Sequence, residues 1–172
     1  MRSWMRLKRF RPEARTSLTP KILTTNPPPP VAMSKPKVFV DANVLLDILL
    51  NRTRYVGDAV HLMKLGMDGR VELVTTASVL HAARYVGMRE RGRACIELLE
   101  ALMRNLTLIP ESMDAIRGAL SYKDPEDAAL ALCCLEQGIA WLATRNVADF
   151  AAFQERGLRP VLPSVLCARI MI

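Results

Sequence analysis

The chain has 172 residues and few of the residue types on which several kinds of protein depend. Aromatic residues make up only 5% of it, whereas hydrophobic residues make up 51%, which predicts a globular domain with an aliphatic core and excludes a disordered chain. The sequence has only two histidines, His61 and His81, and neither stands in an order typical of a Ser-His-Asp or Cys-His catalytic site. Its length fits one ordinary domain.

The sequence also lacks paired cysteines and long apolar runs. Its four cysteines form no C-x-x-C pair and no group with zinc-ligand spacing, and Cys133 and Cys134 lie in an apolar stretch with helical spacing. Buried, reduced thiols are typical of a cytoplasmic protein, which is the location we expect. The longest apolar run, Val44 to Leu50, is interrupted by Asp47 and falls short of the roughly 18 residues that a membrane span needs. We expect no membrane partner.

Basic charge is concentrated near the N-terminus. Residues 1–32 contain seven basic residues and one acid, whereas the rest of the chain has 17 basic and 16 acidic residues. The net charge of +7 is therefore no sign that the folded part binds RNA.

Residues 1–36 lack apolar periodicity and include the run Pro27–Pro30, so we expect a flexible or extended segment outside the core. Its arginine-rich opening has two open explanations, a targeting peptide or a start codon assigned too early, with Met33 as the natural alternative start. The folded domain is expected over residues 37–172.

From Lys37 onward, short β-branched runs alternate with longer helical patterns, which predicts an α/β fold with a central, mostly parallel five-stranded sheet. Gly69, Gly138 and Gly157 precede expected strands, where a helix should stop. The expected strands are Val38–Val40, Val71–Val74, Leu106–Ile109, Ala140–Ala143 and Pro160–Leu162.

Helices between these strands are indicated by apolar spacing and by capping residues. Asp124 is a favoured cap residue and Pro125 suits a first turn, so a helix should begin there. Two inward-facing stripes are expected, one of Val56, Ala59, Val60, Met63 and Met67, and one of Cys95, Leu98, Leu99 and Leu102.

Acidic residues follow the expected strand ends. Asp41 comes directly after the first strand, Asp127 opens a helix, and Asp149 follows the fourth strand. Ligands of open parallel sheets bind beyond the carboxyl ends of the strands, so these acids can converge there. Converging carboxylates repel one another, and Mg²⁺ or Mn²⁺ would relieve that repulsion while activating water for phosphodiester hydrolysis.

Each of these acids has an ordinary structural alternative. Asp41 can cap a helix that begins near Ala42, Asp127 can be a first-turn acid favoured by the helix dipole, and Asn146 and Asp149 can be caps before the next helix. The spacing alone does not decide between these roles and a shared site.

Three further polar residues have two interpretations each. Asp47 stands four residues after Asn43 and can belong to the solvated stripe of a helix. Arg145 is either a two-point phosphate ligand or a surface residue, because guanidinium geometry matches phosphate oxygens. His81 is by default a tolerated helix residue, with a metal or catalytic role as the alternative.

Two segments resemble the motifs of PIN domains. Val38 to Asp47, V-F-V-D-A-N-V-L-L-D, resembles the opening motif, and Glu126-Asp127-Ala128 with Ala143 to Phe150, A-T-R-N-V-A-D-F, resembles the closing motif. An ordered combination of this length is harder to obtain by chance than one short motif. The resemblance covers about residues 37–163, and Arg52 also resembles one PIN branch.

The resemblance implies a Rossmann-like α/β/α sandwich and a Mg²⁺- or Mn²⁺-dependent ribonuclease that acts on single-stranded RNA, often as the toxin of a toxin-antitoxin pair of the VapC type. Its implied partners are RNA, an antitoxin protein and a second copy of the chain. The implied metal-binding catalytic acids are Asp41, Asp127 and Asp149. The resemblance implies that Asn43, Thr144 and Asn146 are supporting polar residues and that Asp47 is a structural companion. His81 can support the site by binding the metal or a water, and Arg145 and Arg52 are the expected phosphate-binding residues.

The chain departs from the family pattern at one acid. The family often places Glu, or in some branches Asn, on the helix after the second strand, where this chain has His81 or Ala82 depending on a one-residue register. A PIN-fold RNA-binding or scaffold protein without turnover is therefore the alternative. A haloacid-dehalogenase-type phosphatase ranks last, because that family has a second Asp where Asn43 stands.

Overall fold

The computed structural model describes residues 35–170, and within them five strands form one sheet. The strand order is β3-β2-β1-β4-β5, and every pair is parallel. All five expected strands are confirmed to within one residue at each end. The strands are β1 (Lys37–Val40), β2 (Glu72–Thr75), β3 (Thr107–Leu108), β4 (Trp141–Ala143) and β5 (Arg159–Val161).

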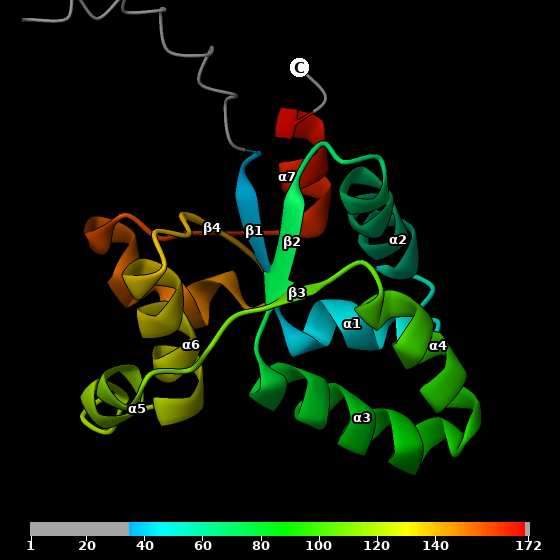
Figure 1. The fold of residues 1–172 in the computed structure, drawn as a ribbon, viewed down its shortest axis with the longest axis horizontal. Coiled ribbons are helices and arrows are strands. Elements are labelled where there is room, and N and C mark those ends of the chain that lie inside the picture. Colours follow the sequence, from blue (N-terminus) through cyan, green and yellow to red (C-terminus); the bar gives the residue numbers. More distant parts are fainter. Residues whose placement is uncertain (1–34, 171–172) are drawn as a thin grey trace, which may run out of the picture. The chain divides into compact units, whose positions relative to one another are not determined.

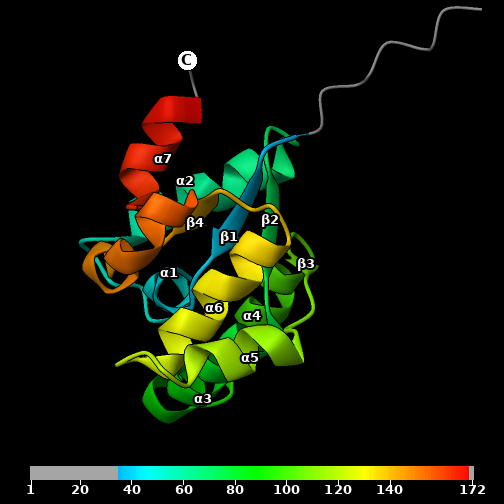
Figure 2. The same cartoon turned by 90° about the vertical axis from the view of Figure 1, so that its left-hand side faces the viewer.

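Helices cover both faces of the sheet, which gives the expected α/β/α sandwich (Figure 1). Helices α5 and α6 lie on one face, which Figure 2 turns toward the viewer, and α1, α2, α4 and α7 lie on the other. Helix α3 runs past the carboxyl ends of the strands. The helical segments are α1 (Ala42–Leu49), α2 (Val56–Met67), α3 (Ala77–Arg91), α4 (Ala94–Met103), α5 (Met113–Ala119), α6 (Pro125–Glu136), the 3-10 segment η1 (Val147–Arg156) and α7 (Pro163–Ile170).

Glycines end the helices that precede three of the strands, as expected. Gly69, Gly138 and Gly157 have φ angles of +68°, +65° and +99°, a left-handed conformation that side chains with a Cβ adopt only at a cost. The chain can therefore stop a helix and enter the next strand within a few residues. Because every strand pair is parallel, the carboxyl ends of the strands lie at one edge of the sheet.

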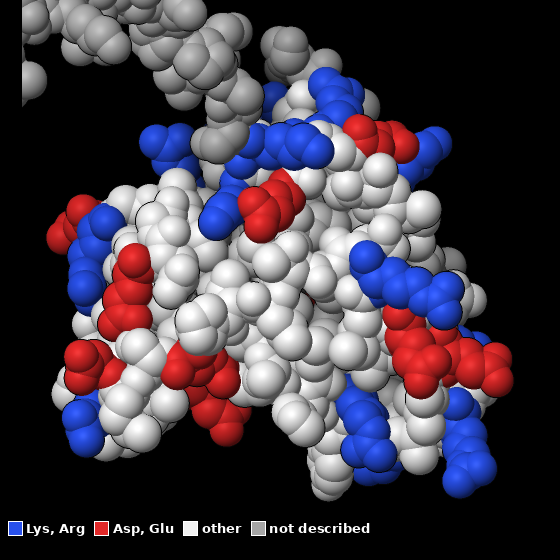
Figure 3. Space-filling view, in the orientation of Figure 1, with Lys and Arg blue, Asp and Glu red and all other residues white. Residues whose placement is uncertain are grey.

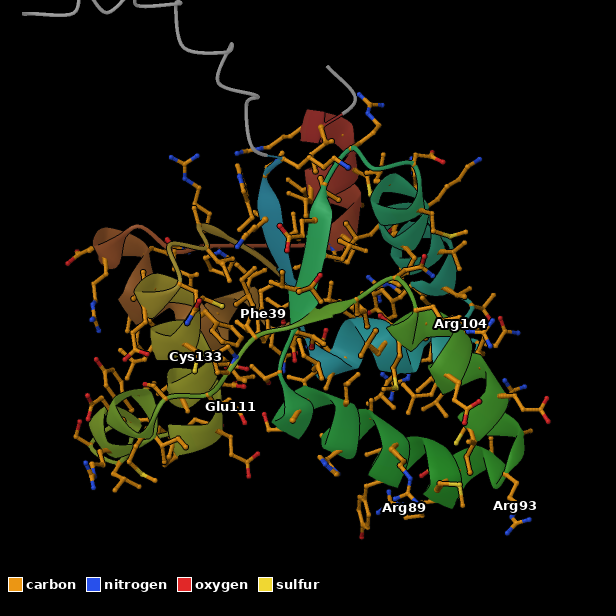
Figure 4. The ribbon with its side chains drawn as sticks, viewed as in Figure 1. Phe39, Arg89, Arg93, Arg104, Glu111 and Cys133 are labelled. Carbon is orange, nitrogen blue, oxygen red and sulfur yellow. The ribbon has the colours of Figure 1, made fainter. Side chains whose placement is uncertain are left out.

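The core is aliphatic with a few phenylalanines. Phe39 of β1 is fully buried and lies near the middle of the sheet (Figure 4). All four cysteines are buried and free, as expected of reduced thiols. Within residues 35–170, no helix has both the length and the apolar content that a membrane crossing requires.

One of the two expected helix faces is only partly confirmed: Ala59 and Met63 of α2 are buried as expected, but two other members of the stripe are not. Val60 and Met67 of α2 are 49% and 67% exposed, while Leu62 and Leu65 are buried. Apolar residues lie on both sides of the expected stripe, and packing against α7 selected the neighbouring one. The expected face of α4 is confirmed by the buried Cys95, Leu99 and Leu102, with Leu98 partly buried. The expectation for residues 1–36 falls almost entirely outside the described residues.

Candidate acidic active site

The adjacent strands β1 and β4 bring the residues that follow them into contact. The backbone N–H of Asp41 donates to the carbonyl of Ala143 at 3.1 Å, and the Asp41 side chain is buried. Although Asp41 is the N-cap residue of α1, its side chain makes no capping hydrogen bond. Instead, its Oδ2 accepts hydrogen bonds from Thr144 Oγ1, at 2.6 Å, and from Asn43 Nδ2. The carboxylate is thus held by Thr144, after the neighbouring strand, and by Asn43 of its own helix, while backbone N–H groups of Ala42 and Asn43 also lower its pKa.

Thr144 is the centre of this hydrogen-bond network. Its fully buried Oγ1 donates to Asp41 and accepts from Asn43 Nδ2 and from the N–H of Asn146, both at 3.0 Å. Asn43 Oδ1 in turn accepts the N–H of Arg145 at 3.0 Å. The structure therefore brings together Asp41, Asn43, Thr144 and the backbone of residues 145–146, as the sequence motifs predicted.

Two opposing effects set the charge state of Asp41. Burial raises the pKa of its carboxyl above the ordinary value, because the charged form loses solvation, and the hydrogen bond from Thr144 lowers it. Without Thr144 the carboxylate would be more difficult to keep ionised.

Thr144→Val is expected to destabilise the protein by about 1–3 kcal/mol, because the isosteric change leaves the Asn146 N–H without its partner and removes one of the two side-chain hydrogen bonds to the buried Asp41 Oδ2. If Asp41 acts in catalysis, activity should also fall by about 10- to 100-fold. Urea denaturation and cleavage kinetics measure the two effects. Thr144→Ser, which keeps the hydroxyl, should recover most of both, and an equal loss in the serine variant would contradict this role.

Asp127 lies in the first turn of α6. Its N–H donates to Asp124 Oδ1 at 3.3 Å, so Asp124 is the helix cap and the Asp127 carboxylate is left for another role. Burial is the main cause that raises the pKa of Asp127 to about 6, and the negative charges of Asp124, Asp41 and Asp149 raise it further. Charges interact in this way only when they are close, so Asp41, Asp127 and Asp149 share one neighbourhood.

Asp149 and Asn146 lie at the exposed side of this neighbourhood. Asp149 is in the first turn of η1, and its N–H donates to the Asn146 carbonyl at 3.1 Å. The Asn146 side chain makes no capping hydrogen bond. Asp149 and Arg145 both line a hollow of about 630 Å³ whose other walls include Pro160 and Leu162.

The structure does not bring His81 to these acids. His81 is exposed and lines a separate apolar hollow with Leu99 and Met103 of α4. Ala82 stands one helical turn after Ser78, whose side chain borders a different hollow, next to Glu111, Pro125 and Glu126 at the start of α6. Glu111 follows β3 and accepts a hydrogen bond from Ser78, and Figure 4 labels it between α6 and the start of α3.

Asp47 is not on a solvated stripe, so that interpretation is wrong. It is fully buried in α1, with Arg52 Nη1 at 3.3 Å from Oδ1 and Arg145 Nε at 3.2 Å from Oδ2. Burial raises the pKa of Asp47, although Arg145 and Arg52 oppose the rise. Sequence reasoning missed this cluster, and the available signal was a charged residue with apolar neighbours on both sides. The guanidinium of Arg145 also lies over the ring of Tyr55, 4.7 Å from its centroid.

The donor set of the three acids fits a hard divalent cation. Within residues 35–170, no lysine or arginine forms an ion pair with Asp41, Asp127 or Asp149, so their mutual repulsion has no direct counter-charge. No three His, Cys, Asp or Glu side chains in that range lie close enough to hold an ion directly. Mg²⁺ keeps several of its waters and needs only one or two carboxylates, so it suits this looser arrangement.

Fold and site together define a three-layer α/β domain with an acidic site at the carboxyl edge of its parallel sheet. The chain matches the PIN domain model over residues 37–148 and belongs to the PIN domain family. PIN domains are generally nucleases and typically use divalent metal ions. Comparison with curated proteins gives no match.

Proposed function

We propose that residues 37–172 form a metal-dependent ribonuclease domain that hydrolyses phosphodiester bonds of single-stranded RNA. Asp41, Asp127 and Asp149 would hold Mg²⁺ or Mn²⁺ partly through water molecules that the ion keeps. The observation that carries this proposal is the nearness of Asp41 and Asp149 to Asp127: burial is the main cause that raises the pKa of Asp127 to about 6, and the charges of Asp124, Asp41 and Asp149 add to the rise. Such an uncompensated acidic group favours a cation over a purely structural role.

The chain's own residues orient and protect this acidic group. Thr144 and Asn43 hold the Asp41 carboxylate in one orientation through its Oδ2. The bound cation would supply an activated water and neutralise charge on the phosphodiester. Arg145 lines the same hollow as Asp149, and its guanidinium would bind a phosphate oxygen of the RNA there.

A cleavage assay with the purified full chain tests the proposal. We expect a labelled single-stranded RNA to be cut with Mg²⁺ or Mn²⁺ and to remain intact with EDTA, while the matching single-stranded DNA and double-stranded RNA are poor substrates. RNA that is bound but never cut, with any divalent ion, would contradict the nuclease and favour the scaffold alternative. The Asn43 amide bonded to Asp41, where a phosphatase would need a second acid, gives the phosphatase alternative no support.

The absent second acid is the observation that favours the scaffold alternative, and it can be restored. We expect Ala82→Glu to tighten Mg²⁺ binding by about tenfold, because one more carboxylate on the α6-facing side of α3 adds ligand charge. Calorimetric titration with Mg²⁺ measures the affinity, and the cleavage rate should rise with it. His81→Glu is the matched control, because His81 borders a different hollow. If His81→Glu tightened Mg²⁺ binding and Ala82→Glu did not, the assignment of the missing acid to position 82 would be wrong.

The partners follow from the resemblance to VapC-type toxins. We propose RNA as the ligand, an antitoxin protein and a second copy of the chain as protein partners, and the cytoplasm as the location. Ile116 and Leu120 of the α5 region are 41% and 70% exposed, which favours a protein partner over free solvent. Light scattering measures whether the chain is a dimer in solution.

A further inference from the structure

A second charged cluster adjoins the acidic site, and its centre is the buried Asp47. The Asp47 side chain is 1% exposed, and the side chains of Arg52 and Arg145 are 34% and 25% exposed. One carboxylate therefore faces two guanidinium groups in a partly buried setting. The cluster carries a net positive charge that an anion would balance.

The two arginines are held in different ways. Arg52 Nη1 donates a hydrogen bond to Asp47 Oδ1, while Arg145 Nε is 3.2 Å from Oδ2 without the geometry of a hydrogen bond. Asp47 Oδ2 and Arg145 Nε are the buried side-chain atoms that have no hydrogen-bond partner within residues 35–170. Arg145 is thus fixed by charge and by its position over the Tyr55 ring. Most N–H donors of both arginines are not used by Asp47.

The cluster lies directly beside the acids. Arg145 lowers the pKa of Asp41, which requires the two charges to be close, and it lines the hollow that Asp149 also lines. Arg145 also lines a second, smaller hollow. Its other lining residues include Asp47, Arg54, Tyr55 and the exposed Asp58. Arg145 therefore borders both the hollow of the acidic site and the hollow that Arg54 lines.

We propose that Asp47 is a positioning residue that holds Arg52 and Arg145 as a clamp for RNA phosphate groups beside the acidic site. The identity of the ligand as RNA rests on the proposed function. A guanidinium binds phosphate best when its plane is fixed in advance, and a buried carboxylate fixes it without competing from the surface. Figure 3 shows basic and acidic groups interspersed on the face in view.

Metal-free RNA binding tests the clamp separately from cleavage. The full chain and Asp47→Asn are titrated against a labelled single-stranded oligouridylate in EDTA at several salt concentrations, with fluorescence anisotropy as the readout. We expect Asp47→Asn to weaken binding by about tenfold, and the slope of log affinity against log salt to become shallower by about 0.7 for each arginine that disengages. A purely structural Asp47 predicts the opposite sign, because removing a negative charge near RNA should tighten binding. Such tightening would overturn the clamp.

Two further variants make the result specific. Asp58→Asn removes a negative charge from the same hollow. Within the described part of the chain Asp58 forms no ion pair with Arg52 or Arg145, so the affinity of this variant for RNA should equal or exceed that of the wild type. Arg145→Gln should weaken binding, and adding Asp47→Asn to a double Arg52→Gln and Arg145→Gln variant should weaken it no further, because Asp47 acts through those arginines. A full additional loss would overturn the proposal.

If Asp47→Asn does not fold, as judged by urea denaturation, Arg52→Lys and Arg145→Lys give the test instead. Both keep a cation against the buried carboxylate but lose the planar fork, so we expect several-fold weaker binding with an unchanged salt slope. Wild-type affinity in both variants would overturn the clamp.

The clamp and the nuclease can fail independently. RNA binding that falls in Asp47→Asn, in a protein that never cleaves RNA, supports the clamp and contradicts the nuclease. If the wild type cleaves RNA and Asp47→Asn binds RNA equally well or more tightly, the nuclease is supported and the clamp is contradicted. A wild-type protein that binds no single-stranded RNA overturns the clamp.

Discussion

Asp41→Asn is expected to reduce metal-dependent RNA cleavage by on the order of a thousandfold. The loss follows from removing the carboxylate that Thr144 and Asn43 orient, because an amide oxygen carries too little charge to hold a hard cation. The same change should raise the free energy of unfolding of the metal-free protein by about 1 kcal/mol. Asp41 is only 6% exposed, and burial already disfavours its charged form, so a neutral side chain of the same shape relieves that cost.

A rate assay and urea denaturation in EDTA separate the two effects of Asp41→Asn. The matched control is Asp114→Asn, which neutralises an exposed aspartate whose weak contact is with Arg117. That control should leave both cleavage and stability close to the wild-type values. Substantial cleavage by a folded Asp41→Asn protein would remove Asp41 from the mechanism.

The second large effect is a pH dependence of stability that comes from Asp127. Its folded-state pKa of about 6 lies above the ordinary value of 3.8, so the folded protein binds this proton more tightly than the unfolded chain does. The free energy of unfolding of the metal-free protein should therefore fall as pH rises from about 4 to about 6, by about 2–3 kcal/mol, and then level off. Urea denaturation at a series of pH values in EDTA measures this fall.

Asp127→Asn should remove most of that fall, because asparagine has no proton to lose. Asp41 and Asp47 also have raised pKa values, so a smaller decline in the same direction should remain in the variant. Added Mg²⁺ should stabilise the wild type above pH 6 more than at pH 4.5, where a protonated Asp127 binds cations poorly. Parallel stability curves for the wild type and Asp127→Asn would contradict this account of the site.

The sheet was predictable because its signals are local. β-branched runs mark the strands, and Gly69, Gly138 and Gly157 mark the ends of the preceding helices by their positive φ angles. The buried face of α2 was not predictable in the same way, because apolar residues lie on adjacent stripes and the choice between them depends on α7. Periodicity gives the existence of a buried face, whereas tertiary packing decides its register.

The candidate site was likewise predictable only where its sequence signals are local. The motifs named the acids and Thr144, since each follows a strand or opens a helix, but the bonding of Asn43 to both Asp41 and Thr144 needs β1 and β4 side by side. The choice between His81 and Ala82 depends on a rotation of α3 that no local signal fixes. Asp47 was misread because four-residue spacing to Asn43 resembles a polar stripe, while one of its two cationic partners, Arg145, comes from the distant segment after β4.

The pairing of β1 with β4 also determines when the protein becomes competent during its synthesis. Thr144 lies 103 residues after Asp41, so a ribosome makes the first half of the site long before the second. β4 must pair with the free edge of β1 before the two halves meet. The proposed active site can therefore assemble only after nearly all of the domain has been synthesised.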